Sequence, residues 1–434
     1  MEQRGTREQA LGRLLDTAED ASPLQAVEAV THDLAESLGA TAVSFLIADL
    51  SGRALVRLTD VGDNPSEPES DRRDADDSAE EMPFDGGPAE EALRSQSVQV
   101  LAPDEEGRRR DTWTVLAPVT ERGEALGLLE MSLPAEPDRT VLAEIVRTAH
   151  VLGFVVIANR RHTDLFEWGQ RSTPYSLPAE IQRRLLPAAY TCEAGSFTLS
   201  AWLEPAANVG GDTFDYSLAR DVLHLSITDA MGHGVSSALT ATLCIGSLRN
   251  SRRQGHTLLE QVGTANEALL EHATDIGLDG FVTGLVGRLD LASGSLALVN
   301  AGHVAPYLAR EGKVAAVELP IGLPLGLFGD STYSTTEVML EPGDRLVFVT
   351  DGMLERSAAA LDLIAEIQET RSLHPRETTR CLADKVLEVT GPVLADDATM
   401  LVLDWQGGHG SPGGERSTVG GADSSGSGPI RSDR

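Results

Sequence analysis

Four short strings that contain aspartate constrain this chain more than any other feature of its sequence. Three of them adjoin a run that is typical of a buried β-strand, because runs at 222–227 and 345–350 lead into an aspartate and a run at 399–403 follows one. A carboxylate at the end of an apolar strand is costly unless a cation meets it. The strings read VGGDTFD at 209–215, ITDAMGHG at 227–234, VTDG at 349–352 and ADDAT at 395–399.

No Lys or Arg lies within the four strings, so the required cation must come from elsewhere. Converging carboxylates predict a divalent metal site, and a ligand set made of oxygen atoms favours Mg²⁺ or Mn²⁺ over Zn²⁺. Each string taken alone has a simpler explanation, because Asp-Gly pairs form turns and a single Asp often caps a helix. The four strings together, three of them beside a strand-like run, favour the metal site.

As a set, the motifs resemble the metal-dependent PPM (type 2C) Ser/Thr protein phosphatases, and most closely their bacterial SpoIIE/RsbU-like branch. The resemblance covers residues 196–405 and implies an α+β phosphatase domain. Such a domain has a β-sandwich of two antiparallel sheets flanked by helices, with the metals at one end of the sandwich. The motifs that carry it are VGGD ending at Asp212, DAMGHG from Asp229, NAGH ending at His303, TDG around Asp351 and DDAT from Asp396.

The resemblance also implies ligands for two divalent metal ions, Mn²⁺ or Mg²⁺. Asp229 would bridge the two ions, with the backbone carbonyl of Ala230 on the second. Asp351 and Asp396 would complete the first ion, and Asp212 would hold the second, directly or through water. A hydroxide bridging the two metals would attack the phosphate. The predicted catalytic residues are therefore Asp212, Asp229, Asp351 and Asp396.

Several positions near these motifs remain open. Asp215 and Asp397 are alternative ligands, and the sequence does not settle which carboxylate of each pair faces the metals. In eukaryotic-type members a Gly and a His follow the bridging Asp, whereas Ala and Met follow Asp229 here. His233 is then a candidate proton donor, although a structural hydrogen bond in the turn is the simpler role. We expect His303 to pack at the edge of the core.

Upstream of the motifs, residues 22–160 follow the order helix, strand, turn, strand, hairpin, helix. This order resembles a GAF domain, so we expect a GAF-like α/β sensor domain. Whether it binds a small-molecule ligand or only packs or dimerises is left open. The elements lie at 23–38, 41–47, 54–58, 114–133 and 140–160.

Three further segments complete the predicted organisation. Residues 1–21 are an N-terminal helical extension, and residues 406–434 are a Gly/Ser-rich disordered tail. Residues 161–195 are a linker whose prolines bracket a short helix, LPAEIQRRLLP at 177–187. Resemblance to the SpoIIE/RsbU branch implies that this helix acts as a regulatory switch, although a plain linker helix explains it equally well. About 60–91, with 13 acidic and 2 basic residues, we expect a disordered insertion in the sensor domain.

Composition limits the partners and the cellular compartment that we expect for this chain. A formal net charge of −32 argues against nucleic acid or an anionic membrane as the main partner. The three cysteines are widely spaced, which fits free thiols in a reducing compartment. The N-terminal residues lack the apolar stretch of a signal peptide, and the longest apolar run, 151–158, is too short to span a bilayer. We therefore expect a cytoplasmic protein.

The predicted function is a metal-dependent protein phosphatase that acts on phosphoserine or phosphothreonine of a regulatory protein. By resemblance this partner is a phosphorylated STAS-type anti-anti-sigma factor, and the GAF-like domain, which could form a homodimer, regulates the activity. The alternative is a catalytically inactive phosphatase-like sensor or scaffold that only binds its partner. The string GGDTF at 210–214 is superficially similar to the diguanylate cyclase signature. That reading leaves the other three strings unexplained.

Overall fold

The structure is a computed structural model, and it describes residues 12–49, 54–61, 81–84, 86–103, 111–170, 176–205, 210–276, 280–354, 362–391, 394 and 396–408. Its contacts divide the chain into two compact units. Residues up to 172, apart from 122–124, belong to the first unit, and residues 173–415 belong to the second. Both units are mixed α+β and are built on antiparallel sheets.

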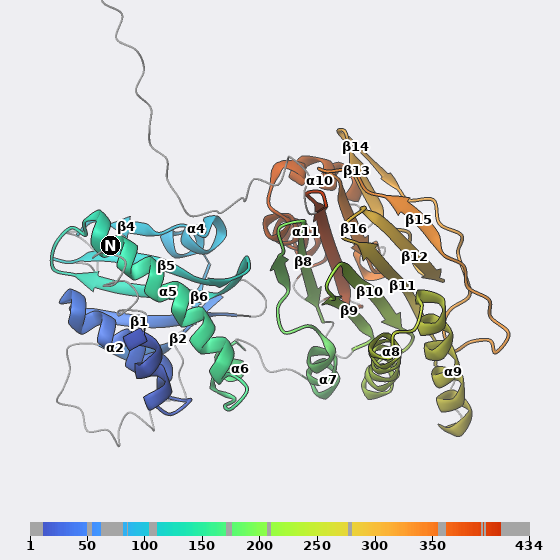
Figure 1. Ribbon diagram of the computed structural model, residues 1–434, viewed down its shortest axis with the longest axis horizontal. Coiled ribbons are helices and arrows are strands. Elements are labelled where there is room, and N and C mark those ends of the chain that lie inside the picture. Colours follow the sequence, from blue (N-terminus) through green and yellow to red (C-terminus); the bar gives the residue numbers. More distant parts are fainter. Residues whose placement is uncertain are drawn as a thin grey trace, which may run out of the picture. The chain divides into compact units, whose positions relative to one another are not determined.

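The first unit is one six-stranded sheet with the strand order β3-β2-β1-β6-β5-β4 (Figure 1). The helix predicted at 23–38, the strand at 41–47, the hairpin and the final helix are all confirmed as α2, β1, β5–β6 and α5. Its elements are α2 (Ala26–Leu38), β1 (Ala42–Ala48), β2 (Ala54–Val61), β3 (Glu81–Pro83), α4 (Pro88–Ser95), β4 (Gln99–Leu101), β5 (Trp113–Glu121), β6 (Glu124–Leu133), α5 (Arg139–Asn159) and α6 (Leu165–Gly169).

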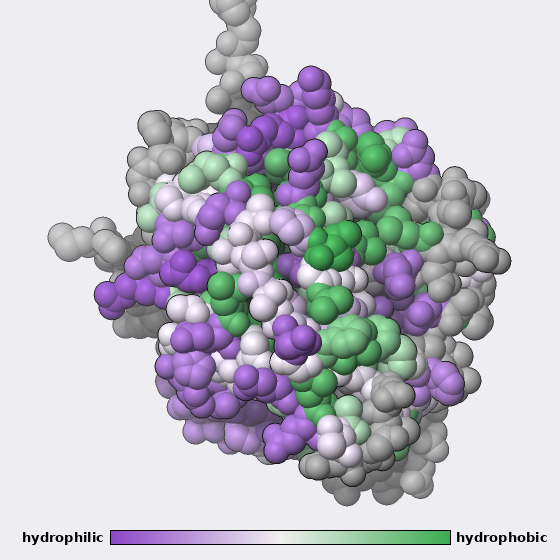
Figure 2. All heavy atoms as spheres, turned by 90° about the vertical axis from the view of Figure 1, so that its right-hand side faces the viewer, coloured by the Kyte–Doolittle hydropathy of each residue, from purple (hydrophilic) through white to green (hydrophobic). Residues whose placement is uncertain are grey.

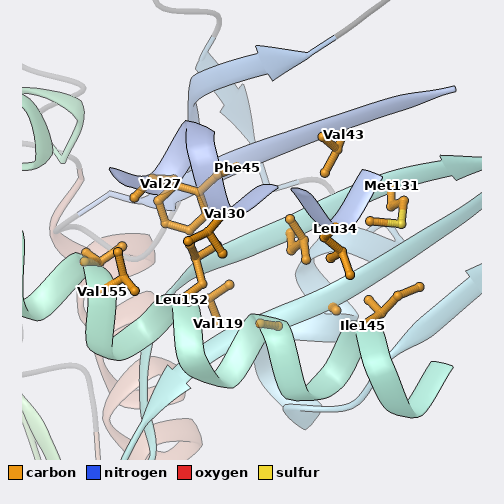
Figure 3. Close-up of a cluster of buried hydrophobic side chains, with 14 of the residues drawn as sticks. Val27, Val30, Leu34, Val43, Phe45, Val119, Met131, Ile145, Leu152 and Val155 are labelled. Carbon is orange, nitrogen blue, oxygen red and sulfur yellow. The ribbon is translucent and has the colours of Figure 1, made fainter. Parts of the chain in front are cut away.

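Two apolar layers hold the first unit together. On one face of the sheet, α2 and α5 pack their apolar stripes against alternate residues of the strands. Val30, Phe45 and Leu152 lie in this layer (Figure 3). The other face is covered by α4, whose Ala92 and Leu93 are buried against the sheet. Alternation of side chains along each strand supplies both layers from the same sequence.

The expected acidic insertion is partly ordered. Of residues 60–91, those at 62–80 and 85 lie outside the described part of the chain, but the C-terminal end forms β3 and the start of α4. The prediction of disorder is therefore wrong for this end. Glu90 is buried, and its carboxylate accepts hydrogen bonds from the Gly86 N–H and the Arg94 guanidinium. This local pairing lets an acidic segment close over the sheet.

By length and composition alone, one helix of the described residues, α5, could cross a membrane. Seven of its residues, among them Ile145 and Leu152, are buried in the core of the first unit. Packing on the sheet explains these buried residues, whereas Val146 and Phe154 of the same helix are exposed.

The second unit is a β-sandwich between layers of helices (Figure 1). One sheet has the order β15-β12-β11-β10-β9, and the other β14-β13-β16-β17-β8-β7. Its elements are α7 (Leu177–Leu185), β7 (Thr191–Glu193), β8 (Phe197–Glu204), β9 (Asp212–Leu218), β10 (Val222–Ala230), α8 (Val235–Arg253), α9 (Leu258–Ile276), β11 (Val282–Asp290), β12 (Ser295–Ala301), β13 (Tyr307–Arg310), β14 (Lys313–Ala316), β15 (Thr336–Met339), β16 (Arg345–Val349), η2 (Asp351–Met353), α10 (Leu363–Glu369), η3 (Thr370–Ser372), α11 (Pro375–Thr390) and β17 (Ala398–Trp405).

Three apolar layers account for this arrangement. Residues from both sheets, such as Phe214, Ile227 and Phe348, form the core between the sheets. The outer face of the first sheet packs on α8 and α9, and the outer face of the second packs on α10 and α11. The expected sandwich of two antiparallel sheets flanked by helices is confirmed. Figure 2, which views the right-hand side of Figure 1, shows apolar residues among polar ones on the exposed surface.

The short helix predicted between the two domains belongs to the second unit. Ser176 caps α7 at its N-terminus, and the helix packs against α8 and β9. The helix itself is confirmed, but it is an integral part of the sandwich unit rather than a free linker. Residues 171–175 just before it, residues 1–11 and most of the predicted tail, 409–434, lie outside the described residues.

Candidate active site

Two of the predicted aspartates lie opposite each other on neighbouring strands. Asp212 is the first residue of β9, and Asp229 is the last but one of β10. The antiparallel register pairs Asp212 with Asp229, and Asp229 with Thr283 on β11. Directly opposite residues point to the same face of a sheet. Both carboxylates therefore lie on the inner face of the first sheet, at one end of the sandwich.

The other aspartates come from the second sheet. Asp351 directly follows β16 and begins the 3₁₀ turn η2, where it is exposed. Asp396 and Asp397 directly precede β17, which pairs with β16. Asp396 is half-buried, whereas Asp397 is buried. Facing sheets thus bring together residues that are 185 positions apart in the sequence, such as Asp212 and Asp397.

Asp212 is held by two threonine hydroxyls. Its Oδ2 atom accepts a hydrogen bond from Thr350 Oγ1 at 2.7 Å and another from Thr399 Oγ1 at 2.6 Å. Thr350 precedes Asp351 in the TDG motif, and Thr399 ends the DDAT motif. The carboxylate is buried, so these hydroxyls offset part of its desolvation cost.

Asp397 holds the main chain around Asp212. Its Oδ2 atom accepts hydrogen bonds from the N–H groups of Gly211 and Asp212 at 3.1 and 3.3 Å, and from Gln182 Nε2 at 2.7 Å. Gln182 Nε2 also donates to the Asp212 carbonyl at 2.8 Å. Of the Asp396–Asp397 pair, Asp397 therefore accepts from two main-chain N–H groups and from the Gln182 side chain. Asp396 accepts the Asp397 N–H and is the more accessible carboxylate.

Two glycines permit close backbone approaches here. A Cβ on Gly352 would lie 2.0 Å from the Asp397 carbonyl oxygen, and a Cβ on Gly211 would lie 2.4 Å from the Ala230 carbonyl oxygen. Any side chain at either position would push apart the segments that carry the aspartates. The glycines of the VGGD and TDG motifs are thus required by packing.

Burial and mutual repulsion perturb the carboxylates strongly. Burial, followed by repulsion from Asp351, Asp396 and Asp397, raises the pKa of Asp229 to about 7. Burial and repulsion from Asp229 raise the pKa of Asp212 well above its usual value, against the effect of the threonine hydroxyls. Burial also raises the pKa of Asp396. Such perturbed acids in one place are typical of a functional site.

The chemistry of this donor set fits a hard divalent cation, because the charged groups that act on Asp229 are all carboxylates. Within the described residues, however, no three His, Cys, Asp or Glu side chains form a group that could hold a metal ion as they stand. Asp351 and Asp396 thus lie close enough to Asp229 to raise its pKa, as expected. Among the described residues, however, the three carboxylates do not form a closed ligand set. Like charges repel, so ionised carboxylates approach to ligand distance only around a cation.

Asp215, the alternative to Asp212, has a different environment. The two residues are three apart on β9, so their side chains point to opposite faces of the sheet. Asp215 pairs with Arg249 at 2.8 Å and with Arg252 at 3.1 Å, both on α8. Its expected role as a substitute ligand is corrected on this basis: its carboxylate balances two arginines beneath the helices.

His303 and His233 lie in different environments. The His303 ring is buried, its Nδ1 atom lies 2.9 Å from Thr283 Oγ1, and burial lowers its pKa to about 4. The side chain of Asn300 bonds both the N–H and the carbonyl of His303, which fixes the turn of the NAGH motif. His303 therefore packs at the core edge, as expected. His233 is exposed in the turn before α8.

Sequence reasoning missed three residues that build this site. Thr350 and Thr399 lie inside the TDG and DDAT motifs, but no role was predicted for their hydroxyls. Gln182 was visible only as part of the short helix at 177–187. For the two threonines, a hydroxyl within an aspartate motif was the available signal, because a buried carboxylate needs donors.

Comparison with known proteins assigns the second unit. Residues 219–406 match the family model described as Stage II sporulation protein E (SpoIIE). The chain is 23% identical to the phosphoserine phosphatase RsbU of Bacillus subtilis over 233 residues, which cover 52% of this chain and 68% of RsbU. It is also 23% identical to protein IcfG of Synechocystis over 255 residues, covering 52% of this chain and 40% of IcfG.

A solved structure of the RsbU and RsbW domains of a Mycobacterium tuberculosis protein is similar at 28% identity and a TM-score of 0.44. This similarity covers 49% of this chain and 62% of that structure. The chain thus spans only part of the length of several relatives. From these comparisons, residues 219–406 match the SpoIIE family of PPM phosphoserine phosphatases, which are hydrolases.

Proposed function

We propose that this chain is a divalent-cation-dependent protein phosphatase that hydrolyses phosphoserine or phosphothreonine on a regulatory protein. The observation that carries the proposal is the cluster of Asp229, Asp351 and Asp396, in which burial, and then the charges of the other two carboxylates, raise the pKa of Asp229 to about 7. A group of acids at the edge of the core, without a cationic partner among the groups that act on Asp229, is costly for the fold. A role in binding a cation explains that cost.

In this proposal Asp229, Asp351 and Asp396 would hold one Mn²⁺ or Mg²⁺ ion. Asp229, Asp212 and the Ala230 carbonyl would hold a second. When bound, such ions neutralise phosphoryl charge and lower the pKa of a coordinated water. The chain itself fixes Asp212, its carboxylate through the two threonines and its carbonyl through Gln182. No side chain needs to act as the nucleophile.

The substrate is a phosphorylated STAS-type anti-anti-sigma protein in the cytoplasm. This part of the proposal is supported by the names of the relatives RsbU and RsbP of Bacillus subtilis, both described as phosphoserine phosphatases. RsbP is 22% identical over 195 residues. The net charge of −32 disfavours nucleic acid as a partner and is consistent with a protein substrate.

The first unit is proposed to be a GAF-like sensor that regulates the phosphatase domain. The active site of that domain requires Mn²⁺ or Mg²⁺ in this proposal. Regulation would pass through α7, because Gln182 on this helix contacts both the Asp397 carboxylate and the Asp212 carbonyl. A shift of α7 would release those contacts and loosen Asp212. A small-molecule ligand of the first unit, and pairing of two copies through it, are further parts of this proposal.

The test is hydrolysis of a phenyl phosphate, and then of a phosphorylated STAS protein, by the full chain with Mn²⁺, with Mg²⁺ and with a chelator. We expect turnover only with a divalent ion, and its loss in Asp229→Asn. The matched control is Asp221→Asn, an exposed aspartate just before the same strand at its other end. Full activity of Asp229→Asn, or equal activity in the chelator, would contradict the proposal.

The rival function is a phosphatase-like scaffold that only binds its partner. It would account for the absence of a closed ligand group among the described residues, but repulsion between the carboxylates accounts for that absence as well. The same assay separates the two functions: a scaffold would bind the phosphorylated STAS protein without releasing phosphate under any divalent ion.

A further inference from the structure

We infer that Thr350 and Thr399 are positioning residues that set the affinity of the acidic cluster for a divalent cation by fixing the Asp212 carboxylate. This inference rests on the proposed function, because it assigns a task to residues at the same site. It concerns two hydroxyls that lie in different motifs and reach one oxygen atom, Asp212 Oδ2.

The direction of the first hydrogen bond follows from its surroundings. Thr350 Oγ1 accepts the Thr399 N–H at 3.0 Å, so its own proton is free for one acceptor. Asp212 Oδ2 lies at 2.7 Å, whereas the other acceptor in reach, the Thr399 carbonyl, lies at 3.5 Å. The shorter contact is the stronger one. Thr350 therefore donates to Asp212.

The second hydroxyl completes the arrangement. Thr399 Oγ1 lies 2.6 Å from the same Asp212 Oδ2 atom, and both threonines are fully buried. Two O–H donors occupy this oxygen and prevent the carboxylate from rotating. Asp212 Oδ1 is then the oxygen left for a cation.

The main chain of Asp212 is fixed as well. Its N–H donates to Asp397 Oδ2, and its carbonyl accepts from Gln182 Nε2. A ligand that is already immobile loses little conformational entropy on binding an ion. Groups that orient metal ligands typically contribute about 10- to 100-fold to metal affinity when they are mutated.

The chain offers a matched control in the same sheet. Thr213, next to Asp212 on β9, is fully buried like the two positioning threonines. Its hydroxyl pairs with that of Thr228 at 2.5 Å and does not reach Asp212 in the described contacts. Thr213→Val therefore removes a buried hydroxyl of equal size without touching the carboxylate.

The experiment is titration calorimetry of the full chain with Mn²⁺ alone, with urea unfolding of each variant in a chelator. We expect Thr350→Val and Thr399→Val to weaken Mn²⁺ binding about 10- to 100-fold, and Thr350→Ser and Thr399→Ser to restore it to within about threefold. Thr213→Val should lose stability in urea but keep its Mn²⁺ affinity. In activity assays, the valine variants should need more Mn²⁺ to reach the same kcat.

Several results would overturn the inference. Valine variants that fold and bind Mn²⁺ within about twofold of the unchanged chain would remove the task assigned to the hydroxyls. So would serine variants that bind as weakly as the valine ones. If a valine variant does not fold, the alanine variant at the same position is titrated by the same criterion. If the unchanged chain hydrolyses phosphate with Mn²⁺ and the threonine substitutions leave its Mn²⁺ affinity unaltered, only this inference is contradicted. If the unchanged chain binds no Mn²⁺, the proposed function is contradicted as well.

Discussion

Gln182 Nε2 donates a hydrogen bond to Asp397 Oδ2 at 2.7 Å across a separation of 215 positions in the sequence. This contact joins α7 to the segment that precedes β17, and a second bond from the same nitrogen reaches the Asp212 carbonyl. The side chain of Gln182 is buried, so both bonds are shielded from water. The position of α7 is therefore linked to the position of the motif aspartates.

Replacing Gln182 by Leu should disconnect α7 from this site. The Asp397 carboxylate would lose a buried donor, which costs about 1–3 kcal/mol. We expect a lower free energy of unfolding in urea and faster amide exchange in α7, together with lower phosphatase activity. Arg184→Ala is the control, because Arg184 lies on the exposed face of the same helix. Equal exchange rates in the two variants would argue against the link.

Asp215 and Asp212 should respond differently to the same change. Asp215→Asn removes the charge that balances Arg249 and Arg252, so we expect a loss of stability with unchanged Mn²⁺ affinity. Asp212→Asn should weaken Mn²⁺ binding. Calorimetric titration with Mn²⁺ checks both. A large loss of Mn²⁺ affinity in Asp215→Asn would restore it as a ligand.

The metal-free protein should lose stability as the pH rises from about 4 to about 7. Burial and neighbouring carboxylates raise the pKa of Asp229 from 3.8 to about 7. A folded state that binds more protons than the unfolded state is destabilised as the pH rises through this window. Urea unfolding in a chelator at several pH values measures the effect.

The control for this pH dependence is Asp229→Asn, which cannot ionise at this position and should show a flatter profile. Adding Mn²⁺ should recover stability in the unchanged chain mainly at the upper end of the window, because a cation binds the ionised carboxylates. Parallel profiles for the two proteins would show that Asp229 does not titrate as described.

Arg345 should be essential for folding of the second unit. It is fully buried, and its guanidinium pairs with both carboxylate oxygens of Asp404 at 2.6 and 2.8 Å. It also donates to Thr378 Oγ1 and to the carbonyls of Thr370 and Leu373. Arg345→Met leaves Asp404 without this partner and should cost about 3–5 kcal/mol in urea unfolding. Lys313→Met, at an exposed position on β14, should change stability little.

Much of the fold could be predicted from the sequence because its signals are local. The apolar spacing of α2 and α5, the alternating hairpin of β5 and β6, and the proline-bracketed α7 all appear in the structure close to their predicted places. The order at the end of the acidic segment was missed, because a high density of charge hides the burial of Glu90 and Leu93.

The sequence by itself determined which strings carry the aspartates and that several of them follow or precede buried strands. Only the tertiary structure decided which member of each pair lies where. Asp212 and Asp215 point to opposite faces of the sheet because both lie on β9 and side chains alternate along a strand. Asp396 and Asp397 differ in their contacts because Gln182 and the Gly211 N–H both donate hydrogen bonds to Asp397. The threonine hydroxyls on Asp212 and the α7 contact arise between segments up to 215 residues apart. Local sequence patterns carry no information on such packing.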